Sequence, residues 1–213
     1  MSELDPIAQY CELRDLPWDD ERAQRMARYL DLLMEFNTAM NLIGPMERKS
    51  VVRELLLDSL VAATARRPKG AILDVGTGAG LPGIPLKIVF PNASLSLVEP
   101  RRKRSTFLKI ATHRLGLEDV TIFRGRIEDF DESGFDVVIS KAFQPPVKWL
   151  KTAAPFVADG GALICMGREG DREELLTKAD ELGLGLAGQS SIGEASPERR
   201  VCFVFEYHAV SSS

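Results

Sequence analysis

Short apolar runs and longer amphipathic segments alternate along the last two thirds of the chain. Apolar runs of about 4–8 residues are typical of strands buried in a parallel sheet, and apolar residues at three- and four-residue spacing indicate helices. We predict strands at residues 71–75, 93–98, 120–123, 135–139, 162–165, 186–190 and 201–207, and helices at 81–89, 103–115, 147–156 and 173–182. This alternation predicts a mostly parallel seven-stranded sheet with helices on both faces. Only a turn region at 193–197 separates the last two strands, which favours an antiparallel hairpin with a reversed edge strand.

The first sixty-odd residues have a helical pattern. Asp19 is a candidate N-cap for a helix with one apolar face, and Asn37 and Asn41 mark its end. A further helix is expected over residues 47–65, with Asp58 either on a solvated edge or in a pocket. We therefore divide the chain into a helical extension packed on the core, a main domain and a disordered tail, at residues 1–68, 69–210 and 211–213.

The segment after the first predicted strand is rich in glycine. Residues 71–83 read Ala-Ile-Leu-Asp-Val-Gly-Thr-Gly-Ala-Gly-Leu-Pro-Gly, so Gly76, Gly78 and Gly80 lie between a strand and a helix. Glycines at this place let backbone N–H groups approach a ligand without a Cβ in the way. Glu99 ends the second strand nineteen residues after Gly80, about where a βαβ unit places a ribose-binding carboxylate. These features predict a nucleoside-binding crevice.

The glycine spacing distinguishes between two kinds of cofactor. Dinucleotide folds carry G-x-G-x-x-G, whereas this chain has G-x-G-x-G preceded by Asp74. An anion beside the turn would repel a diphosphate but suits a ligand with an ammonium or sulfonium group. We therefore predict S-adenosylmethionine and a Rossmann-like α/β fold of class I S-adenosylmethionine-dependent methyltransferases. The same crevice, at the carboxyl ends of the strands, would include residues 127–128 and 140–141.

Composition sets further limits. The 213 residues have a formal net charge of −4, which argues against a generic nucleic-acid coat but allows a local basic face. No apolar run is long enough to span a bilayer, and the N-terminus lacks an export pattern, so we expect a cytoplasmic protein with no membrane partner. Cys11, Cys165 and Cys202 lie outside any C-x-x-C motif, so neither a disulfide framework nor a metal site is indicated. We expect a monomer.

Basic residues are concentrated in one run. It comprises Arg101, Arg102, Lys103 and Arg104 and opens the helix after the second strand. Cations there oppose the helix macrodipole at about 0.3–1 kcal/mol each. The run is badly placed for stability and well placed for phosphates, so we predict that these four residues contact RNA. Further cations that could extend the patch are Arg66, Arg67 and Lys69.

Four segments together resemble one protein family. They are Asn37-Thr-Ala-Met-Asn-Leu42, Leu57-Asp-Ser-Leu60, Asp74-Val-Gly-Thr-Gly-Ala-Gly-Leu-Pro-Gly-Ile-Pro-Leu86 and Val138-Ile-Ser-Lys-Ala-Phe143. Over nearly its whole length the chain resembles the glucose-inhibited division protein B family of bacterial 16S ribosomal RNA guanine-N7 methyltransferases. The resemblance implies methyl transfer from S-adenosylmethionine to a guanine N7 in 16S ribosomal RNA or the small ribosomal subunit. The cofactor contacts that it implies are Gly76, Gly78, Leu81, Glu99, Ile127, Glu128 and Lys141.

The chain departs from the family pattern at four places. Lys141 stands where the family usually has arginine, and Leu55 or its neighbour where it has histidine. Ile43 replaces a threonine, and Met166 lies in Cys165-Met-Gly where the family usually has Leu-Lys-Gly.

Methylation of guanine N7 needs few catalytic groups. The atom has a lone pair and no proton, so no general base is required, and we interpret His113 and His208 as structural or surface residues. We interpret Cys165 as a buried apolar residue rather than as a nucleophile. We interpret Gln144-Pro-Pro146 as a turn that starts a helix rather than as a motif for methylation of exocyclic amines. Asn41, Asp58 and Lys141 are candidates for contact with the guanine. Two other functions remain open: a small-molecule methyltransferase, and a non-catalytic cofactor-binding module on ribosomes.

Overall fold

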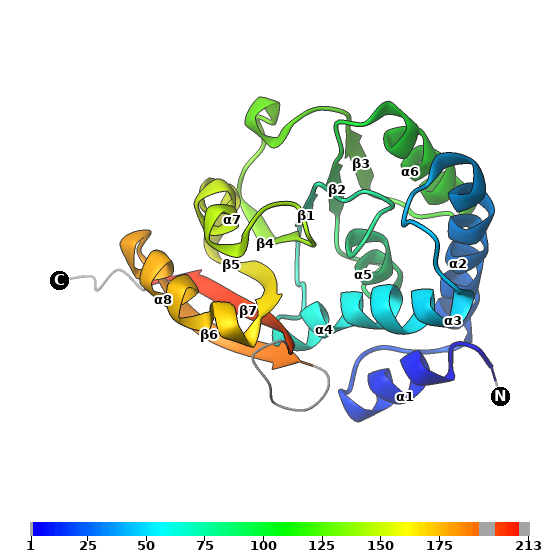
Figure 1. The fold of residues 1–213 in the computed structure, drawn as a ribbon, viewed down its shortest axis with the longest axis horizontal. Coiled ribbons are helices and arrows are strands. Elements are labelled where there is room, and N and C mark those ends of the chain that lie inside the picture. The colour runs from blue at the N-terminus through cyan, green and yellow to red at the C-terminus, as the bar shows by residue number, and fades with distance from the viewer. Residues whose placement is uncertain (1, 192–198, 209–213) are drawn as a thin grey trace.

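The computed structural model describes residues 2–191 and 199–208. A seven-stranded sheet with strand order β3-β2-β1-β4-β5-β7-β6 lies at its centre (Figure 1). The strands are β1 (Ile72–Val75), β2 (Leu95–Val98), β3 (Val120–Phe123), β4 (Phe135–Ser140), β5 (Val157–Arg168), β6 (Leu184–Ser191) and β7 (Arg200–Tyr207). The helices between them are α5 (Gly83–Val89), α6 (Arg102–Arg114), α7 (Pro146–Ala153) and α8 (Arg172–Glu181), with 3₁₀ turns η2 (Ile127–Asp129), η3 (Ala154–Phe156) and η4 (Glu169–Asp171). The predicted alternation of strands and helices is confirmed.

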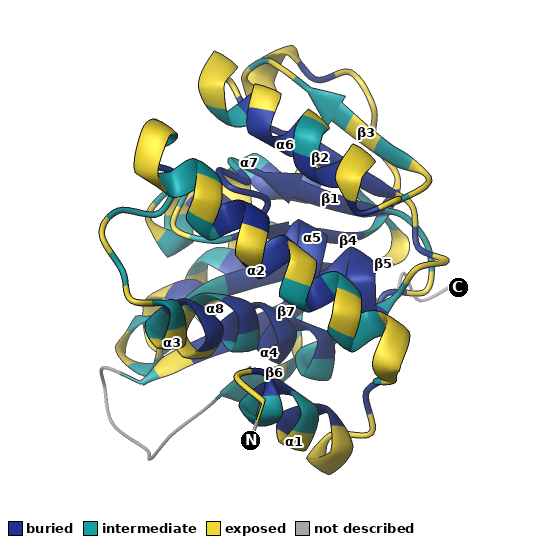
Figure 2. Cartoon of the chain, turned by 90° about the vertical axis from the view of Figure 1, so that its right-hand side faces the viewer, coloured by how far each residue is buried: buried dark blue, intermediate teal, exposed yellow. Residues whose placement is uncertain are grey.

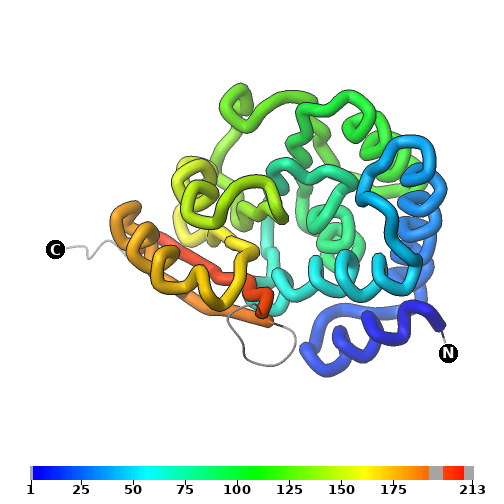
Figure 3. Tube along the Cα trace, viewed as in Figure 1, coloured from blue at the N-terminus to red at the C-terminus, as the bar shows by residue number. Residues whose placement is uncertain are grey.

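The sheet is parallel except for one strand. The pairs β1–β2, β2–β3, β1–β4 and β4–β5 are parallel, and β7 is antiparallel to both β5 and β6. Figure 3 shows the red β7 between the yellow β5 and the orange β6. The hairpin is therefore confirmed, but the reversed strand is not the edge strand. Five consecutive residues of β7, from Val201 to Phe205, are buried, and a strand that is apolar on both faces belongs inside a sheet.

The N-terminal part is helical, as predicted. Its elements are α1 (Asp5–Leu13), α2 (Asp20–Met40), α3 (Arg48–Ser50), the π-helical segment η1 (Val51–Leu56) and α4 (Leu57–Ala65). Asp19 caps α2, because its side chain accepts a hydrogen bond from the backbone N–H of Arg22. The helix expected over residues 47–65 is present, but six of its residues have the wider π geometry.

Side chains from alternate positions of the strands form two cores. One face, with Ile72, Leu97 and Val137, packs in a single cluster with residues of α1, α2, α4, α5 and α6. The opposite face, with Leu73 and Val138, packs against α7 and α8. Figure 2 shows buried central strands and exposed outer surfaces on α1, α2 and α6. The N-terminal helices thus share a core with the sheet.

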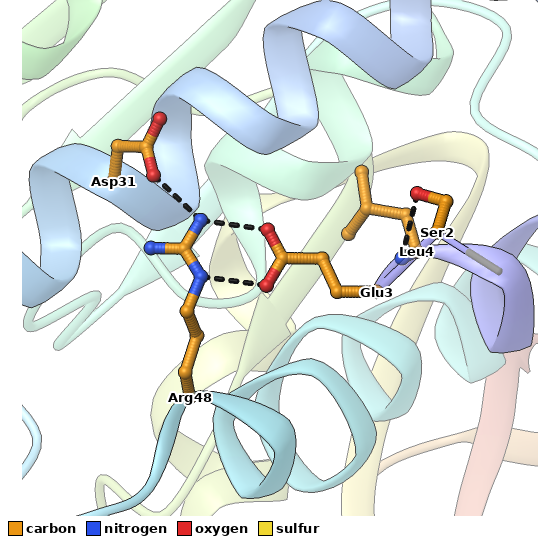
Figure 4. A network of polar contacts seen from close by, with 5 residues as sticks. All are labelled: Ser2, Glu3, Leu4, Asp31 and Arg48. Atoms are coloured by element: carbon orange, nitrogen blue, oxygen red, sulfur yellow. Dashed lines mark hydrogen bonds and ion pairs between the residues drawn. The ribbon is translucent and has the colours of Figure 1, made fainter.

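An ion-pair network joins the N-terminal segment to two helices (Figure 4). Arg48 donates through Nε and Nη2 to the two carboxylate oxygens of Glu3, at 2.6 and 2.7 Å, and Nη2 also reaches Asp31 Oδ1 at 2.5 Å. These groups are partly exposed, so the pairs orient the chain more than they stabilise it.

Several predicted boundaries differ from the observed ones by one or more residues. The helix expected from residue 81 begins at Gly83, after a turn in which Gly80 has a φ of +96° and the N–H groups of Gly80 and Leu81 donate to Thr77 O. The strand expected at 162–165 is part of the twelve-residue β5, in which Gly160 and Gly161 interrupt the apolar pattern. Within the described ranges, no helix is long and apolar enough to cross a membrane. The expected turn at 193–197 and tail at 211–213 lie outside the described residues.

Candidate functional site

Asp74 closes the turn between β1 and α5. Its Oδ2 accepts hydrogen bonds from Thr77 Oγ1 at 2.6 Å and from the N–H of Gly83, the first residue of α5, at 2.8 Å. Burial raises the pKa of Asp74 to about 7; the hydrogen bonds from Thr77 and Gly83 oppose this rise, and the nearby charge of Glu99 adds to it. Asp74 therefore holds the turn from inside the core, rather than facing a cationic ligand as an exposed anion.

The first two glycines of the turn adopt backbone conformations that suit glycine. Gly76 and Gly78 have φ of +66° and +61°, in the left-handed region that other residues rarely enter. A Cβ on Gly76 would also lie 2.4 Å from Cδ2 of Phe143. Gly76 is thus required by conformation and by packing, and Phe143 covers the turn.

Glu99 connects the turn to α6. Its side chain is buried, and its Oε2 and Oε1 accept hydrogen bonds from the N–H groups of Gly78, at 3.0 Å, and Arg101, at 2.8 Å. Arg104 Nη1 lies 4.0 Å from Oε2. One buried carboxylate therefore organises both the glycine turn and the start of α6, where the sequence places its basic run.

A cavity of about 260 Å³ opens beside this turn. We call it the first cavity. It lies at the carboxyl ends of β1 and β2, and its wall residues are Val75, Gly76, Val98, Pro100, Arg126, Ile127, Glu128 and Phe143. Mostly apolar walls with a few polar groups are typical of sites for small organic ligands.

A second cavity, of about 520 Å³, lies at the carboxyl ends of β4 and β5. Lys141 and Ala142 line it, whereas the next residue, Phe143, lines the first cavity, so the loop after β4 separates the two. Ala142 has a φ of +55°, which is uncommon for a residue other than glycine. The remaining walls come from η1 and α4 (Leu55, Asp58, Val61), the loop and start of α7 (Gln144, Pro146), β5 and η4 (Met166, Gly167, Arg168, Asp171) and β7 (Arg200, Val201, Cys202).

Three charged residues meet in the second cavity. Lys141 Nζ lies 2.7 Å and Arg200 Nη1 3.2 Å from Asp58 Oδ2. The same two groups donate to the backbone carbonyl of Glu54 in the π-helical segment, at 3.1 and 3.3 Å. Asp58 therefore lines a pocket, which decides between the two positions considered from the sequence.

The comparison with known families is decisive. A family model described as rRNA small subunit methyltransferase G (GidB) matches residues 22–202. The chain belongs to this family. The ribosomal RNA small subunit methyltransferase G of Alkaliphilus metalliredigens (strain QYMF) is 37% identical over 164 residues, covering 74% of this chain and 69% of that protein. The one of Lactococcus lactis subsp. cremoris (strain MG1363) is 32% identical over 193 residues, covering 86% and 80%. The predicted family is confirmed.

Solved structures agree on the fold of this methyltransferase G family member. M. jannaschii TYW2 in complex with AdoMet matches with a TM-score of 0.60 and 19% identity, over 77% of this chain and 79% of that one. A ribosomal protein L11 methylase from Lactobacillus delbrueckii subsp. bulgaricus matches with a TM-score of 0.59 and 12% identity, over 73% and 79%. The predicted class I S-adenosylmethionine-dependent methyltransferase fold is confirmed.

The structure brings most of the predicted cofactor residues together. Gly76, Ile127 and Glu128 line the first cavity, and Gly78 and Glu99 are joined by a hydrogen bond at its turn. Two others lie elsewhere. Leu81 is buried in the core, and Lys141 lines the second cavity.

Other predicted positions have structural roles. Asn41 is the C-cap of α2, with a φ of 50°, and lines neither cavity. Arg66, Arg67 and Lys69 precede β1 and so lie at the amino ends of the parallel strands, whereas Arg101 follows the carboxyl end of β2. They therefore do not extend the basic patch at Arg101. Arg66 pairs with Asp136 and Glu206, and Arg67 pairs with Asp15. His113 and His208 are exposed, Cys165 is buried, and α7 starts at Pro146, as predicted.

Some residues of the two cavities could not be assigned from the sequence. Phe143 belongs to a quoted family segment, but only the structure places it over Gly76. Arg200 carries no local signal, because its partner Asp58 is 142 residues away in the chain. Three of the four departures from the family pattern, at Leu55, Lys141 and Met166, line the second cavity.

Proposed function

We propose that this chain transfers the methyl group of S-adenosylmethionine to N7 of a guanine in 16S ribosomal RNA. Membership of the rRNA small subunit methyltransferase G family is the observation that carries the proposal. The class I fold, shared with a protein solved in complex with AdoMet, supports the cofactor. We also propose that the protein acts in the cytoplasm, as a monomer and without a metal ion.

The first cavity fits the nucleoside half of the cofactor. Gly76 presents backbone without a Cβ at the cavity wall, and Gly78 does so at the adjoining turn. We assign the ribose to Glu99, whose carboxylate already holds the turn, and the adenine to Ile127 and Glu128. Leu81 would act through the shape of the turn. Lys141 would lie at the boundary of the site rather than on the adenosine.

The proposed reaction requires the protein to position the acceptor base and does not require proton transfer. When bound, S-adenosylmethionine supplies an electrophilic methyl group on a sulfonium. The chain would hold the acceptor in line with it, and such positioning can account for a large part of a rate enhancement. Guanine N7 carries no proton, so no side chain needs to act as general base. This agrees with the exposed positions of His113 and His208.

We assign the RNA backbone to the start of α6. Arg101, Arg102 and Lys103 are exposed, and Arg104 is half-buried near Glu99. No acidic residue lies in the first turn of α6, so the positive charge there is not neutralised within that turn. Exposed cations beside a cofactor crevice are well placed to bind the phosphates that flank a target base.

The test uses ribosomal substrates that lack the modification. Purified protein is incubated with methyl-labelled S-adenosylmethionine and either 16S ribosomal RNA or small subunits from a strain that lacks the enzyme. Nuclease digestion and mass spectrometry should then show 7-methylguanosine in one or both substrates. Label in another nucleoside would overturn the N7 assignment. Label only in small metabolites, or cofactor binding without any methylated RNA, would overturn the proposed function.

A further inference from the structure

We propose that the second cavity binds the target guanine, and that Asp58 selects this base by accepting hydrogen bonds from its Watson–Crick edge. The inference rests on the proposed function and adds to it the place of the base and a specificity-determining residue. It is carried by the position of the cavity, the arrangement of charges around Asp58, and the donor pattern of guanine.

The position of the second cavity suits an acceptor. It adjoins the first cavity across the loop of Lys141, Ala142 and Phe143, so a ligand in each would meet at that loop. Its volume of about 520 Å³ lies within the range of roughly 300–1,000 Å³ for small-molecule sites. Enzymes that act on a base take it out of its stack and bind it between apolar side chains. Leu55, Val61 and Met166 provide such side chains here.

Asp58 is held so that one carboxylate oxygen is left for a ligand. Lys141 and Arg200 both contact Oδ2, and among the described residues no hydrogen bond to Oδ1 is found. The side chain is only 11% exposed, yet the residue lines the cavity. A carboxylate oxygen has two lone pairs, so Oδ1 can accept two hydrogen bonds.

The surroundings keep this carboxylate in place. Lys141 and Arg200 are anchored a second time, on the carbonyl of Glu54 in the π-helical segment, and π-helical turns are frequent at functional sites.

Guanine matches the acceptor that Asp58 presents. Its N1–H and 2-amino group are adjacent donors on the Watson–Crick edge, whereas adenine has an acceptor at N1. The N7 atom lies on the other edge of the purine and is an acceptor. A guanine held by Asp58 through N1 and N2 therefore leaves N7 unobstructed. The carboxylate would also lie near the base that becomes cationic on methylation.

The first experiment measures base selectivity without methyl transfer. With S-adenosylhomocysteine saturating, 5′-GMP and 5′-AMP are titrated into the full chain by NMR. We expect GMP to bind at least about tenfold more tightly than AMP, because the free energy of a hydrogen bond to a charged group corresponds to at least that ratio of affinities. Asp58→Asn should remove the preference. Asp131→Asn is the matched control, because it makes the same substitution at an exposed side chain that lines neither cavity, and it should keep the preference.

The second experiment measures methylation of ribosomal substrate by the same variants. Asp58→Asn should lower kcat/KM at least about tenfold, with the affinity for S-adenosylhomocysteine unchanged, and Asp131→Asn should match the wild type. If Asp58→Asn folds poorly, the wild type alone still tests the inference, because the inference fails if the wild type does not prefer GMP to AMP.

Four outcomes would overturn the inference: no GMP preference, a preference retained by Asp58→Asn, displacement of S-adenosylhomocysteine by GMP, or methylation by Asp58→Asn at the wild-type rate. Failure of the wild type to methylate ribosomal RNA is a different result, because it overturns the proposed function.

Discussion

At the scale of single residues, Gly76 is subject to two independent requirements. Its φ is positive, and a Cβ would collide with Phe143. Gly116 has a similar φ of +59° with nothing within 4 Å of its Cβ position. Gly116→Ala should therefore cost about 1–2 kcal/mol of unfolding free energy. Gly76→Ala should cost more and weaken S-adenosylhomocysteine binding by about tenfold or more, measured by denaturation and calorimetry. Equal effects of the two substitutions would show that Phe143 does not constrain the turn.

Asp74 gives the stability of the protein a dependence on pH. Its pKa of about 7 in the folded chain lies above the ordinary value of 3.8, so its contribution to stability is fully present below about pH 4 and is lost as pH rises toward 7. The loss is on the order of 4 kcal/mol. Asparagine at this position can still accept hydrogen bonds from Thr77 and Gly83 but does not ionise. Asp74→Asn should therefore gain stability relative to wild type between pH 4 and 7.

Denaturation at several pH values measures this difference. Asp131→Asn, the same change at an exposed side chain, controls for the loss of one carboxylate. A difference between Asp74→Asn and wild type that stays constant with pH would contradict the expected protonation of Asp74.

The residues that sequence analysis could assign are those close together in the chain. Gly76, Gly78 and Glu99 belong to one βαβ unit, whose geometry relates sequence spacing to position. Asp58, Lys141 and Arg200 come from three elements that only the tertiary fold brings together. No local pattern could show that a carboxylate in the fourth helix meets an arginine of the seventh strand.

At the scale of elements, α6 combines poor helix electrostatics with a position beside the site. Lys103 is exposed in its first turn, where a cation opposes the macrodipole. Lys103→Gln should raise stability by about 0.3–1 kcal/mol. It should also weaken RNA binding and reduce the slope of log K against log salt by about 1, measured by filter binding at several salt concentrations.

The matched control lies at the amino ends of the parallel strands. Lys69 is exposed and precedes β1, so Lys69→Gln removes the same charge far from the carboxyl ends of the strands. It should leave the salt slope unchanged. Equal slopes for the two variants would mean that the start of α6 makes no particular contact with phosphates.

Element types were easier to predict than element geometry. Apolar periodicity locates α6 and α8 to within one residue, because each has one buried face. It cannot reveal the π geometry of η1, since a slip in hydrogen-bond register leaves the apolar pattern of Val51 and Leu56 unchanged. It also cannot order β6 and β7 in the sheet, which depends on how completely both faces of β7 are covered.

At the scale of the whole molecule, the N-terminal helices and the glycine turn form one structure. Residues of α1, α2 and α4 share a core cluster with β1 and α5. Tyr29, in the middle of α2, is fully buried, and its hydroxyl donates to the carbonyl of Ala79 at 2.8 Å. Ala79 lies between Gly78 and Gly80. The proposed helical extension therefore supports the backbone of the proposed cofactor site directly.

Removing the Tyr29 hydroxyl tests this coupling. Tyr29→Phe leaves the Ala79 carbonyl buried without its donor, which should cost about 1–3 kcal/mol of unfolding free energy and weaken S-adenosylhomocysteine binding by up to about tenfold. Tyr207→Phe is the matched control, because that hydroxyl also donates to a backbone carbonyl, Ala154 O at 2.8 Å, from a residue that is 41% exposed and outside both cavities. It should cost less and leave the affinity unchanged. If calorimetry gave the same affinity for Tyr29→Phe and wild type, the helices would stabilise the fold without shaping the site.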